Sequence, residues 1–378
     1  MVNASEPVGQ ANLRETLASV AEIYSALYST KKVGFYRVLK EIVKKGVRKR
    51  TSALQKLRTI AKLHDEDVIR LRLDYYLHMM KLNIAAIYLT KSVDCLKLPQ
   101  ATPFLRSCAN TIPTGTFLTF FYPEHLRPRK LEEVGVKHYT FYERIFSRVD
   151  IDRYVIEIVD SPTSLFSQRK IEEHFNRELR KSKDEEFSDL DIEIHGQEIK
   201  PKVDNKDLAI IRSIELDPLT TASLDVKLGV KKDILEKHVE HVEAVLRGIR
   251  VRKMKSIAGI SRTSLIIVVS GGGKQVLKLM NAALKYPITV ATSVSKDARL
   301  ISLQLLLPGN IDMIRDSTME IREIILDQGL ELIDYYLIDL ETLVNFTVPY
   351  IKELEYSPIA RDWLEKSVRK SLKYLKED

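Results

Sequence analysis

Strand-like and helix-like segments alternate between residues 264 and 338, and their order limits the folds open to the chain. Two segments, 274–286 and 311–328, repeat apolar residues at helical spacing, and each follows turn residues rich in glycine or proline. Runs of β-branched and aliphatic residues predict strands at 264–270, 288–294, 300–307 and 332–338. This order of strand, helix, strand, strand, helix, strand predicts one antiparallel sheet with both helices on one face.

A helical segment that ends in a basic strand precedes this unit. The sequence predicts a helix at 207–214, a second helix capped by Thr220 or Thr221, and a third that begins at Lys231. One face of the third helix is apolar and carries Leu235, Val239, Val242 and Leu246. Gly248 is expected to end that helix, and residues 249–253 alternate as a basic strand would. These elements predict a winged helix-turn-helix.

The first half of the chain shows the same kinds of element in a less regular form. Strands are predicted at 84–90, 116–122 and 137–144, with a short helix at 103–111. Upstream of them, apolar spacing predicts helices at 13–28, at 35–45, after the caps Thr51 and Ser52, and at 66–82. The polar, heavily charged stretch 181–205 is expected to be a linker.

We therefore expect an α+β chain in which two winged helix-turn-helix domains alternate with two ferredoxin-like (β-α-β-β-α-β) domains, with a C-terminal helix. The expected divisions are 1–82 for the N-terminal helices and a degenerate winged helix, 83–180 for a degenerate ferredoxin-like module, 181–205 for the linker, 206–258 for the second winged helix, 259–345 for the second ferredoxin-like module and 346–378 for a helical tail.

Two segments of the second half resemble the Lrp/AsnC feast-or-famine regulators. DLAIIRSIELDPLTTASLDVKLGVKKDILEKHVEHVEAVLRGIRVRK resembles their winged helix, and LIIVVSGGGKQVLKLMNAALKYPITV resembles the start of their effector-sensing, oligomerising domain. LQKLRTIAKLHDEDVIRLRL and IPTGTFLTFFYPEHLRPRKLEE resemble the same pair in degenerate form. The resemblance implies a DNA-binding transcriptional regulator whose ferredoxin-like sheets pair within the chain or form a homodimer. No effector residue is assigned.

Positive charge is concentrated near the N-terminus. Residues 31–62 hold twelve lysines and arginines against one acid, so this window carries +11, whereas the whole chain carries +8. Such a patch favours a polyphosphate partner, and DNA is preferred over RNA. The residues expected to contact nucleic acid are Lys44, Lys45, Arg48, Lys49, Arg50, Lys56, Arg58, Arg70, Lys231, Lys232, Lys237, Arg250, Arg252 and Lys253.

Acidic residues leave other functions open. Asp233, Glu236, Glu240 and Glu243 lie on the predicted recognition helix, where they repel phosphate and favour a factor that binds RNA or ribosomes by shape. A third alternative is an enzyme similar to siroheme decarboxylases, which use the same pair of domains. That activity needs histidines and arginines around a porphyrin, and no sequence motif for such a pocket is evident.

No catalytic residue, cofactor or metal is assigned from the sequence, and the chain is predicted not to be an enzyme. His238 and His241, three residues apart on one helix, could share a metal, but no acidic or cysteine partner is identifiable from spacing. The glycines at 271–273 lack the spacing of a phosphate loop and predict a packing turn. Only Cys95 and Cys108 occur, which excludes a disulfide scaffold and favours a reducing cytoplasm; Cys108 is expected to pack in the helix 103–111. No segment is long and apolar enough to predict a membrane span.

Overall fold

A computed structural model describes residues 70–97, 105–124, 137–147, 167–181, 203–216, 231–252, 262–307 and 311–346. The predicted helices at 13–28, at 35–45 and after Thr51, the second winged-helix helix, almost all of the linker and the C-terminal tail lie outside these residues.

The second ferredoxin-like module is confirmed. Its elements are β8 (Thr263–Ser270), α12 (Gly273–Leu284), β9 (Thr289–Val294), β10 (Leu300–Leu307), α13 (Ile311–Asp327) and β11 (Glu331–Asp339). The strands are antiparallel in the order β11-β8-β10-β9, the order that a split β-α-β unit produces. Gly271 allows α12 to begin close to the sheet, since a Cβ there would overlap the Leu330 side chain. The glycine run is therefore a packing turn, as predicted.

The first half repeats this strand order. Its sheet runs β5-β2-β4-β3, which corresponds strand for strand to β11-β8-β10-β9. The strands are β2 (Leu82–Leu89), β3 (Leu105–Ile112), β4 (Thr116–Pro123) and β5 (Lys137–Phe141). The strands predicted at 84–90 and 116–122 are confirmed. The helix predicted at 103–111 is wrong: residues in this segment pair with β4, and that pairing decides its structure.

The helix predicted at 66–82 is also wrong in its described part. Residues Arg70–Tyr75 form strand β1, whose sequence RLRLDY alternates polar and apolar residues. This two-residue period, together with pairing to β7 (Leu246–Arg252), outweighs the helical spacing of the apolar residues around it. The β1–β7 ribbon joins the first half of the chain to the second, so each half supplies one strand of it.

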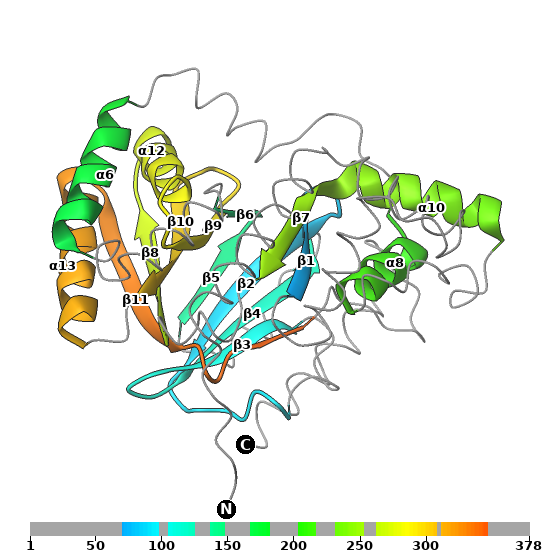
Figure 1. Cartoon of the computed structure of the whole chain (residues 1–378), viewed down its shortest axis with the longest axis horizontal. Helices are drawn as coiled ribbons and strands as arrows, with labels where there is room; N and C mark the ends of the chain where they lie inside the picture. Colours follow the sequence, from blue (N-terminus) through cyan, green and yellow to red (C-terminus); the bar gives the residue numbers. More distant parts are fainter. Residues whose placement is uncertain are drawn as a thin grey trace, which may run out of the picture.

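The two four-stranded sheets join into one sheet that closes on itself (Figure 1). After β5, a single residue, Tyr142, leads into β6 (Glu143–Phe146), which pairs with β9 of the second module. In the reciprocal exchange, β11 reaches β3, and β12 (Val344–Asn345) continues along it. β5 and β6 are the two end strands of the sheet. Because they are consecutive parts of one chain segment, the sheet closes into a barrel. Of the two pairings predicted for these sheets, within the chain or in a homodimer, the structure shows the first, because residues of both modules share one hydrophobic cluster.

Helices cover the outside of the second module. The helix α6 (Gln168–Lys181), which was not predicted, packs against α12 and α13 (Figure 1). The predicted helices at 207–214 and from Lys231 are confirmed as α8 (Asn205–Leu216) and α10 (Lys232–Val245), which pack on each other. α10 runs directly into β7 at Leu246, so Gly248 lies inside a strand and does not end the helix.

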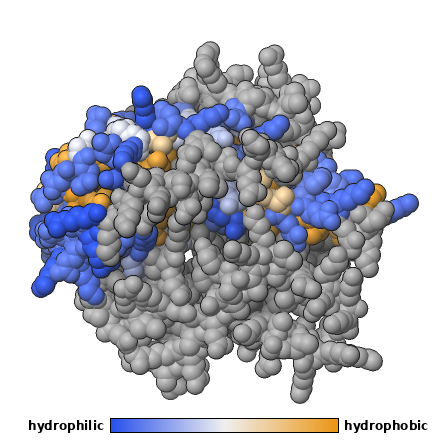
Figure 2. Space-filling model, turned by 90° about the horizontal axis from the view of Figure 1, so that it is seen from above, coloured by the Kyte–Doolittle hydropathy of each residue, from blue (hydrophilic) through white to orange (hydrophobic). Residues whose placement is uncertain are grey.

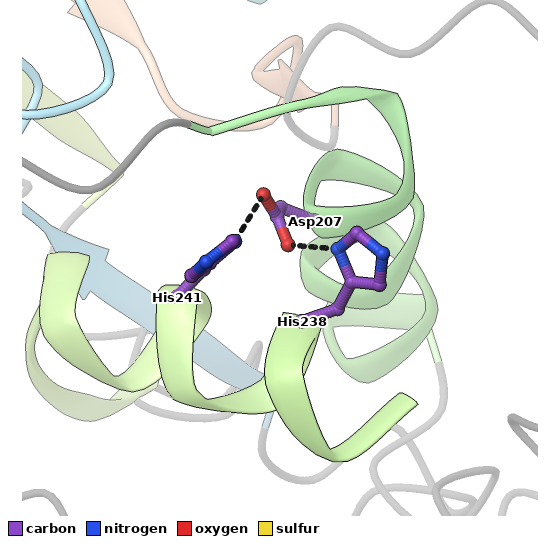
Figure 3. A group of neighbouring side chains, drawn as sticks. All are labelled: Asp207, His238 and His241. Atoms are coloured by element: carbon purple, nitrogen blue, oxygen red, sulfur yellow. Dashed lines mark hydrogen bonds and ion pairs between the residues drawn. The ribbon is translucent and has the colours of Figure 1, made fainter. Parts of the chain in front are cut away.

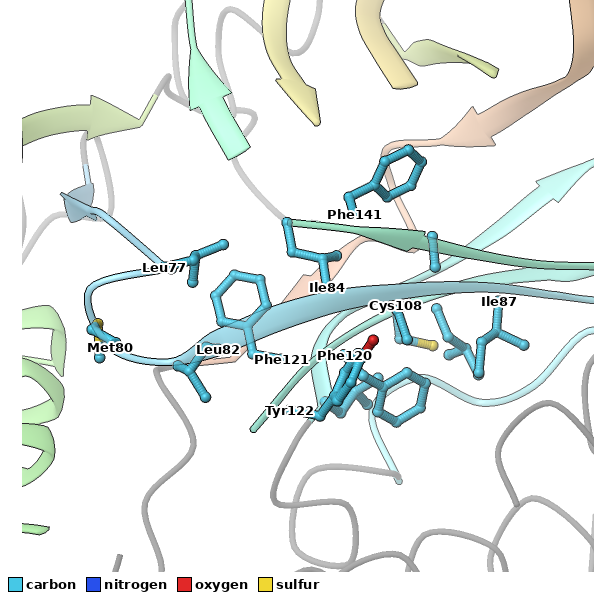
Figure 4. Packing of buried hydrophobic residues seen from close by; sticks show 14 of the residues in the cluster. Leu77, Met80, Leu82, Ile84, Ile87, Cys108, Phe120, Phe121, Tyr122 and Phe141 are labelled. Carbon is cyan, nitrogen blue, oxygen red and sulfur yellow. The ribbon is translucent and has the colours of Figure 1, made fainter. Parts of the chain in front are cut away.

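Two hydrophobic clusters form the core. One fills the first module and extends to α8 and α10 (Figure 4). The other lies between β8–β10 and the helices α6, α12 and α13. Cys108 lies on β3, fully buried, and forms a disulfide with Cys95, which corrects its predicted helical position and the expectation that it serves only in packing.

The described part of the surface seen in Figure 2 is mainly hydrophilic, with hydrophobic patches between polar side chains. No helix in the described ranges is long and apolar enough to cross a membrane. The cytoplasmic location stays a prediction from the sequence.

The turn between β3 and β4 requires glycine. Gly115 has a φ of +116°, and a Cβ there would lie 2.7 Å from the Leu89 carbonyl oxygen and from Thr111 Oγ1. We expect Gly115→Ala to lower the free energy of unfolding by about 3 kcal/mol, because backbone strain and overlap each cost about 1–3 kcal/mol. Urea unfolding measures this change.

Gly329→Ala is the matched control. Gly329 has a φ of +67°, but a Cβ added to it would have no atom within 4 Å, so only the left-handed conformation opposes alanine, at about 1–2 kcal/mol. Equal losses in the two variants would show that the close packing around Gly115 contributes nothing.

Candidate functional site

The interior of the barrel is the first candidate site. Residues directly opposite each other on antiparallel strands point to the same face. Thr119 and Tyr139 both lie opposite Ala86, and Arg144 lies opposite Ser293, which in turn lies opposite Ser302. These side chains therefore point inward from both modules. All of them except Tyr139 line a cavity of about 30 Å³, together with Ile84, Phe117, Phe141, Ile266, Ala291 and Gln304. This space holds one or two water molecules.

Arg144 is the charged group of this cavity. Its Nη2 donates a hydrogen bond of 2.8 Å to Gln304 Oε1, and its Nε is buried with no hydrogen-bond partner. Within the described residues, no carboxylate forms an ion pair with it. Burial, together with the charge of Arg106, lowers the pKa of Arg144 to about 10, although the Asp74 charge acts in the opposite direction. A guanidinium with no ion pair can bind an anion, and its planar arrangement of N–H donors matches the two oxygens of a carboxylate.

Arg106, in contrast to Arg144, has a carboxylate partner. Its guanidinium donates to both carboxylate oxygens of Glu215 at 3.0 and 2.9 Å, and to the carbonyl oxygen of Phe346. Burial alone lowers the pKa of Arg106, but the Glu215 carboxylate outweighs this and raises it. Of these two arginines, only Arg144 forms no ion pair with a carboxylate among the described residues.

A chain of polar groups leads from the surface to the barrel interior. Lys137 Nζ, about half exposed, contacts the Asp334 carboxylate at 3.0 and 3.1 Å. The Tyr139 hydroxyl donates to Asp334 Oδ2 and lies 2.9 Å from the Tyr336 hydroxyl. Tyr336 lies opposite Ile266, which lines the cavity, so its side chain also points inward. The four groups form a continuous hydrogen-bonded path.

Both tyrosines of this path remain protonated at neutral pH. Burial and then the hydrogen bond to Asp334 raise the pKa of Tyr139 well above its usual range. Burial raises the pKa of Tyr336 to about 12, aided by the Asp334 charge, although the hydrogen bond with Tyr139 acts in the opposite direction. The pair therefore places two protonated hydroxyls side by side on the inward face of the sheet.

A second group of buried charges, here called the seam cluster, lies where β6 meets the β1–β7 ribbon. It consists of Asp74, His78, Glu143 and Arg247. Glu143 is fully buried; its carboxylate accepts from His78 Nδ1 at 2.7 Å and forms an ion pair with Arg247 Nη2 at 3.3 Å. It also accepts backbone N–H groups of Leu77, His78 and Arg144. Arg247 Nη1 contacts Asp74 at 3.5 Å and donates to the Arg144 carbonyl at 2.8 Å. Glu143 thereby ties three segments together.

A third group joins α8 to α10 (Figure 3). His238 Nδ1 lies 2.8 Å from Asp207 Oδ1, and His241 Nδ1 lies 3.4 Å from Asp207 Oδ2. Burial raises the pKa of the Asp207 carboxyl, against the hydrogen bonds from the Asp204 backbone and His238. The acidic partner that spacing could not identify for the two histidines is therefore Asp207, which lies near the start of α8, 31 residues before His238.

The residues predicted to contact nucleic acid are only partly brought together. Arg70 lies opposite Arg252 and Arg72 opposite Arg250, so three predicted residues share the β1–β7 ribbon. Lys231 and Lys237 are exposed, at the start and in the middle of α10, and Lys232 is the first residue of that helix. The remaining predicted residues, Lys44, Lys45, Arg48, Lys49, Arg50, Lys56, Arg58 and Lys253, lie outside the described residues.

No local pattern in the sequence singled out Arg144, Tyr139 or Tyr336. The segment KHYTFYER (137–144) was predicted as a strand, and its alternation places Tyr139 and Phe141 on one face. Which face becomes the interior depends on the pairing of β6 with β9, a long-range contact that only the fold reveals.

Comparisons with known proteins give structural matches to an enzyme. No known family profile matches the chain, and no curated protein matches it. A solved structure of the siroheme decarboxylase NirDL in co-complex with an iron-uroporphyrin III analogue shares 11% identity, covers 94% of this chain and 99% of its own, and has a TM-score of 0.47. A second structure of siroheme decarboxylase NirDL shares 10% identity, covers 96% and 99%, and has a TM-score of 0.46.

These findings correct several predictions. Both similar structures are of an enzyme, whereas the sequence predicted a DNA-binding regulator of the Lrp/AsnC type with no catalytic activity and a nucleic-acid partner. Those predictions are withdrawn. Their physical weakness is that they rested on a strand and helix order, which many unrelated functions share, and not on the chemistry of a site.

Proposed function

We propose that this chain is a decarboxylase-type enzyme that binds one carboxylate arm of its substrate inside the barrel. The observation that carries the proposal is Arg144, a guanidinium that points into the cavity with no carboxylate partner in the described residues and with a buried Nε that donates to no acceptor. A buried charge without a counter-ion is costly, and such a cost is typical of a binding site that a charged ligand completes.

The surrounding groups suit a carboxylate arm and not a whole large ligand. The cavity of about 30 Å³ has apolar walls from Ile84, Phe117 and Ile266, with Arg144 and Gln304 as the polar end. The apolar walls can pack against a methylene group, and the guanidinium can donate hydrogen bonds to the carboxylate attached to it. A cavity of this size holds at most the end of such an arm, so the rest of the substrate stays outside it.

The hydroxyl path supplies the proton that a decarboxylation needs. When the bond between the arm and its carboxyl carbon breaks, CO₂ leaves and the electron pair stays on the remaining carbon, which then takes up a proton. The Tyr336 and Tyr139 hydroxyls are the donors inside the barrel, and Asp334 with Lys137 connects them to solvent, from which the proton is replaced.

Tetrapyrroles with carboxylate arms are the first compounds to test. An iron-uroporphyrin III analogue is the ligand in one of the two similar structures. We expect siroheme titrated into the protein to give a saturable shift of its Soret band. A spectrum that equals the sum of the free components at every ratio would contradict a tetrapyrrole substrate.

The proposed proton donor gives a prediction for turnover. Tyr336→Phe removes one hydroxyl of the path, and we expect kcat to fall by about 100-fold, the lower range for loss of a general acid. The substrate KM should change by less than about threefold, because binding of the arm depends on Arg144. Steady-state kinetics with siroheme measures both constants.

Tyr335→Phe is the control for this variant. Tyr335 is the neighbouring residue on β11 and is 57% exposed, so its side chain lies on the opposite face of the strand. We expect its kcat to equal that of the parent chain. A Tyr336→Phe variant with unchanged kcat would exclude the hydroxyl path from the reaction.

A further inference from the structure

We infer that Asp207, His238 and His241 form a binding site for a divalent transition-metal ion of the Zn²⁺ type, which clamps α8 to α10. The site lies away from the barrel and does not depend on the proposed enzyme activity. Two imidazoles and one carboxylate are the ligand types that Zn²⁺ and related ions select.

The positions of the ligand atoms suit one ion. His238 and His241 lie three residues apart on α10, on the face directed at Asp207 (Figure 3). The three candidate ligand atoms lie within 4.8 Å of one another. Ligand distances of about 2.0–2.2 Å hold ligand atoms about 3 Å apart around an ion, so small side-chain rotations close this group around a metal.

One atom of the group lacks a hydrogen-bond partner among the described residues. His238 Nδ1 has a hydrogen bond to Asp207 Oδ1, but His241 Nδ1 is buried and forms no hydrogen bond. Its nearest acidic atom, Asp207 Oδ2, is at 3.4 Å, and Asp207 Oδ2 already accepts the backbone N–H of Asp204 at 2.8 Å. A metal ion would give His241 Nδ1 a partner and leave the hydrogen bond from the Asp204 N–H to Asp207 Oδ2 in place.

A fourth protein ligand is within reach. Asp204 Oδ1 lies 3.5 Å from His238 Nδ1, and its side chain is 45% exposed, so it can turn toward the ion. With neutral imidazoles, the two carboxylates give the site a charge that balances a divalent cation. Asp204 Oδ1 also accepts the N–H groups of Lys206 and Asp207, which holds the carboxylate beside His238 and leaves its second oxygen available to the ion.

The clamp has a structural consequence. α10 continues without a turn into β7, whose Arg247 contacts Glu143 of the seam cluster. α8 in turn carries Glu215, the partner of Arg106 on β3. An ion that holds α8 to α10 therefore also fixes two buried ion pairs that attach this helical pair to the barrel.

The test is a titration of the metal-free full chain with Co²⁺ and Zn²⁺. We expect a saturable Co²⁺ absorption spectrum of a nitrogen- and oxygen-ligated site, its loss on competition with Zn²⁺, and a higher melting temperature with Zn²⁺. His241→Gln should weaken Zn²⁺ binding by at least about 10-fold, the effect already seen for residues that only support metal ligands.

Matched controls separate the site from unspecific binding. His138→Gln removes one histidine from β5, and Glu240→Gln removes one exposed carboxylate from α10, so neither should change Zn²⁺ affinity. Asp207→Asn should act as His241→Gln does. If Asp207→Asn fails to fold, His241→Gln, whose side chain is partly exposed, decides the question. A parent chain that gives no Co²⁺ spectrum, or a His241→Gln variant with parental affinity, would overturn the proposal.

Discussion

Replacing Arg144 by glutamine is expected to weaken binding of a carboxylate-bearing tetrapyrrole by about 100-fold while the folded state is as stable as before, or more stable. The affinity falls because a charge-assisted pair worth about 3 kcal/mol is lost. The stability does not fall because, without ligand, Arg144 is a buried charge with no carboxylate partner in the described residues, and glutamine removes that cost. Soret titration and urea unfolding measure the two effects.

Arg169→Gln is the control for loss of one positive charge. Arg169 lies on α6, its side chain is 86% exposed, and it pairs with Glu173 one helical turn away. We expect its affinity and stability to match those of the parent chain. If Arg144→Gln instead destabilises the fold by several kcal/mol and binds ligand normally, Arg144 is a structural residue and the proposed site is wrong.

Replacing Glu143 by glutamine is expected to lower the free energy of unfolding by about 3–5 kcal/mol. Glu143 is fully buried, and its removal leaves Arg247 and His78 without the carboxylate that they share. Breaking a buried pair by removing one partner costs this much because the other charge remains buried. Urea unfolding followed by circular dichroism measures the change.

Two further variants test whether the loss of stability comes from the buried ion pair of Glu143. Glu341→Gln breaks a pair with Arg262 in which both side chains are mostly exposed, and should cost less than about 1 kcal/mol. Arg247→Met added to Glu143→Gln should lower the stability further, since Arg247 also pairs with the buried Asp74 carboxylate at 3.5 Å. If Glu143→Gln alone costs less than about 1 kcal/mol, well below the usual loss for a broken buried pair, the seam cluster does not hold the ribbon to the barrel.

The second half of the fold could be predicted from the sequence because its signals are local. The strands at 264–270 and 300–307 and both helices follow simple periods, and glycine or proline marks several of their boundaries. The structure places every one of these elements within a few residues of the prediction. The same holds for α8 and α10.

The closure of the barrel could not be predicted, because it depends on contacts between residues far apart in the sequence. β6 of the first half joins β9 of the second, and β12, near residue 345, joins β3. The segment 70–75 forms a strand where a helix was predicted because its partner, β7, lies in the other half of the chain. Local propensity gives way to such pairing.

The candidate sites depend on the same long-range contacts. Arg144 points into the cavity only because β6 crosses to the second module, and Asp207 meets His238 and His241 only because α8 packs on α10. In contrast, the basic patch at 31–62 was conspicuous in the sequence, but it lies outside the described residues and carries no part of the proposed function. Charge density suggested a partner, whereas the chemistry of the site depends on the fold.

Mass spectrometry of siroheme after anaerobic incubation with the protein decides whether the barrel interior supports decarboxylation. We expect products that have lost CO₂ from one or more carboxylate arms, formed rapidly by the parent chain and by Tyr335→Phe, and much more slowly by Arg144→Gln and Tyr336→Phe. Siroheme recovered unchanged from the parent chain, or the same products formed equally fast by Arg144→Gln, would contradict the proposed function.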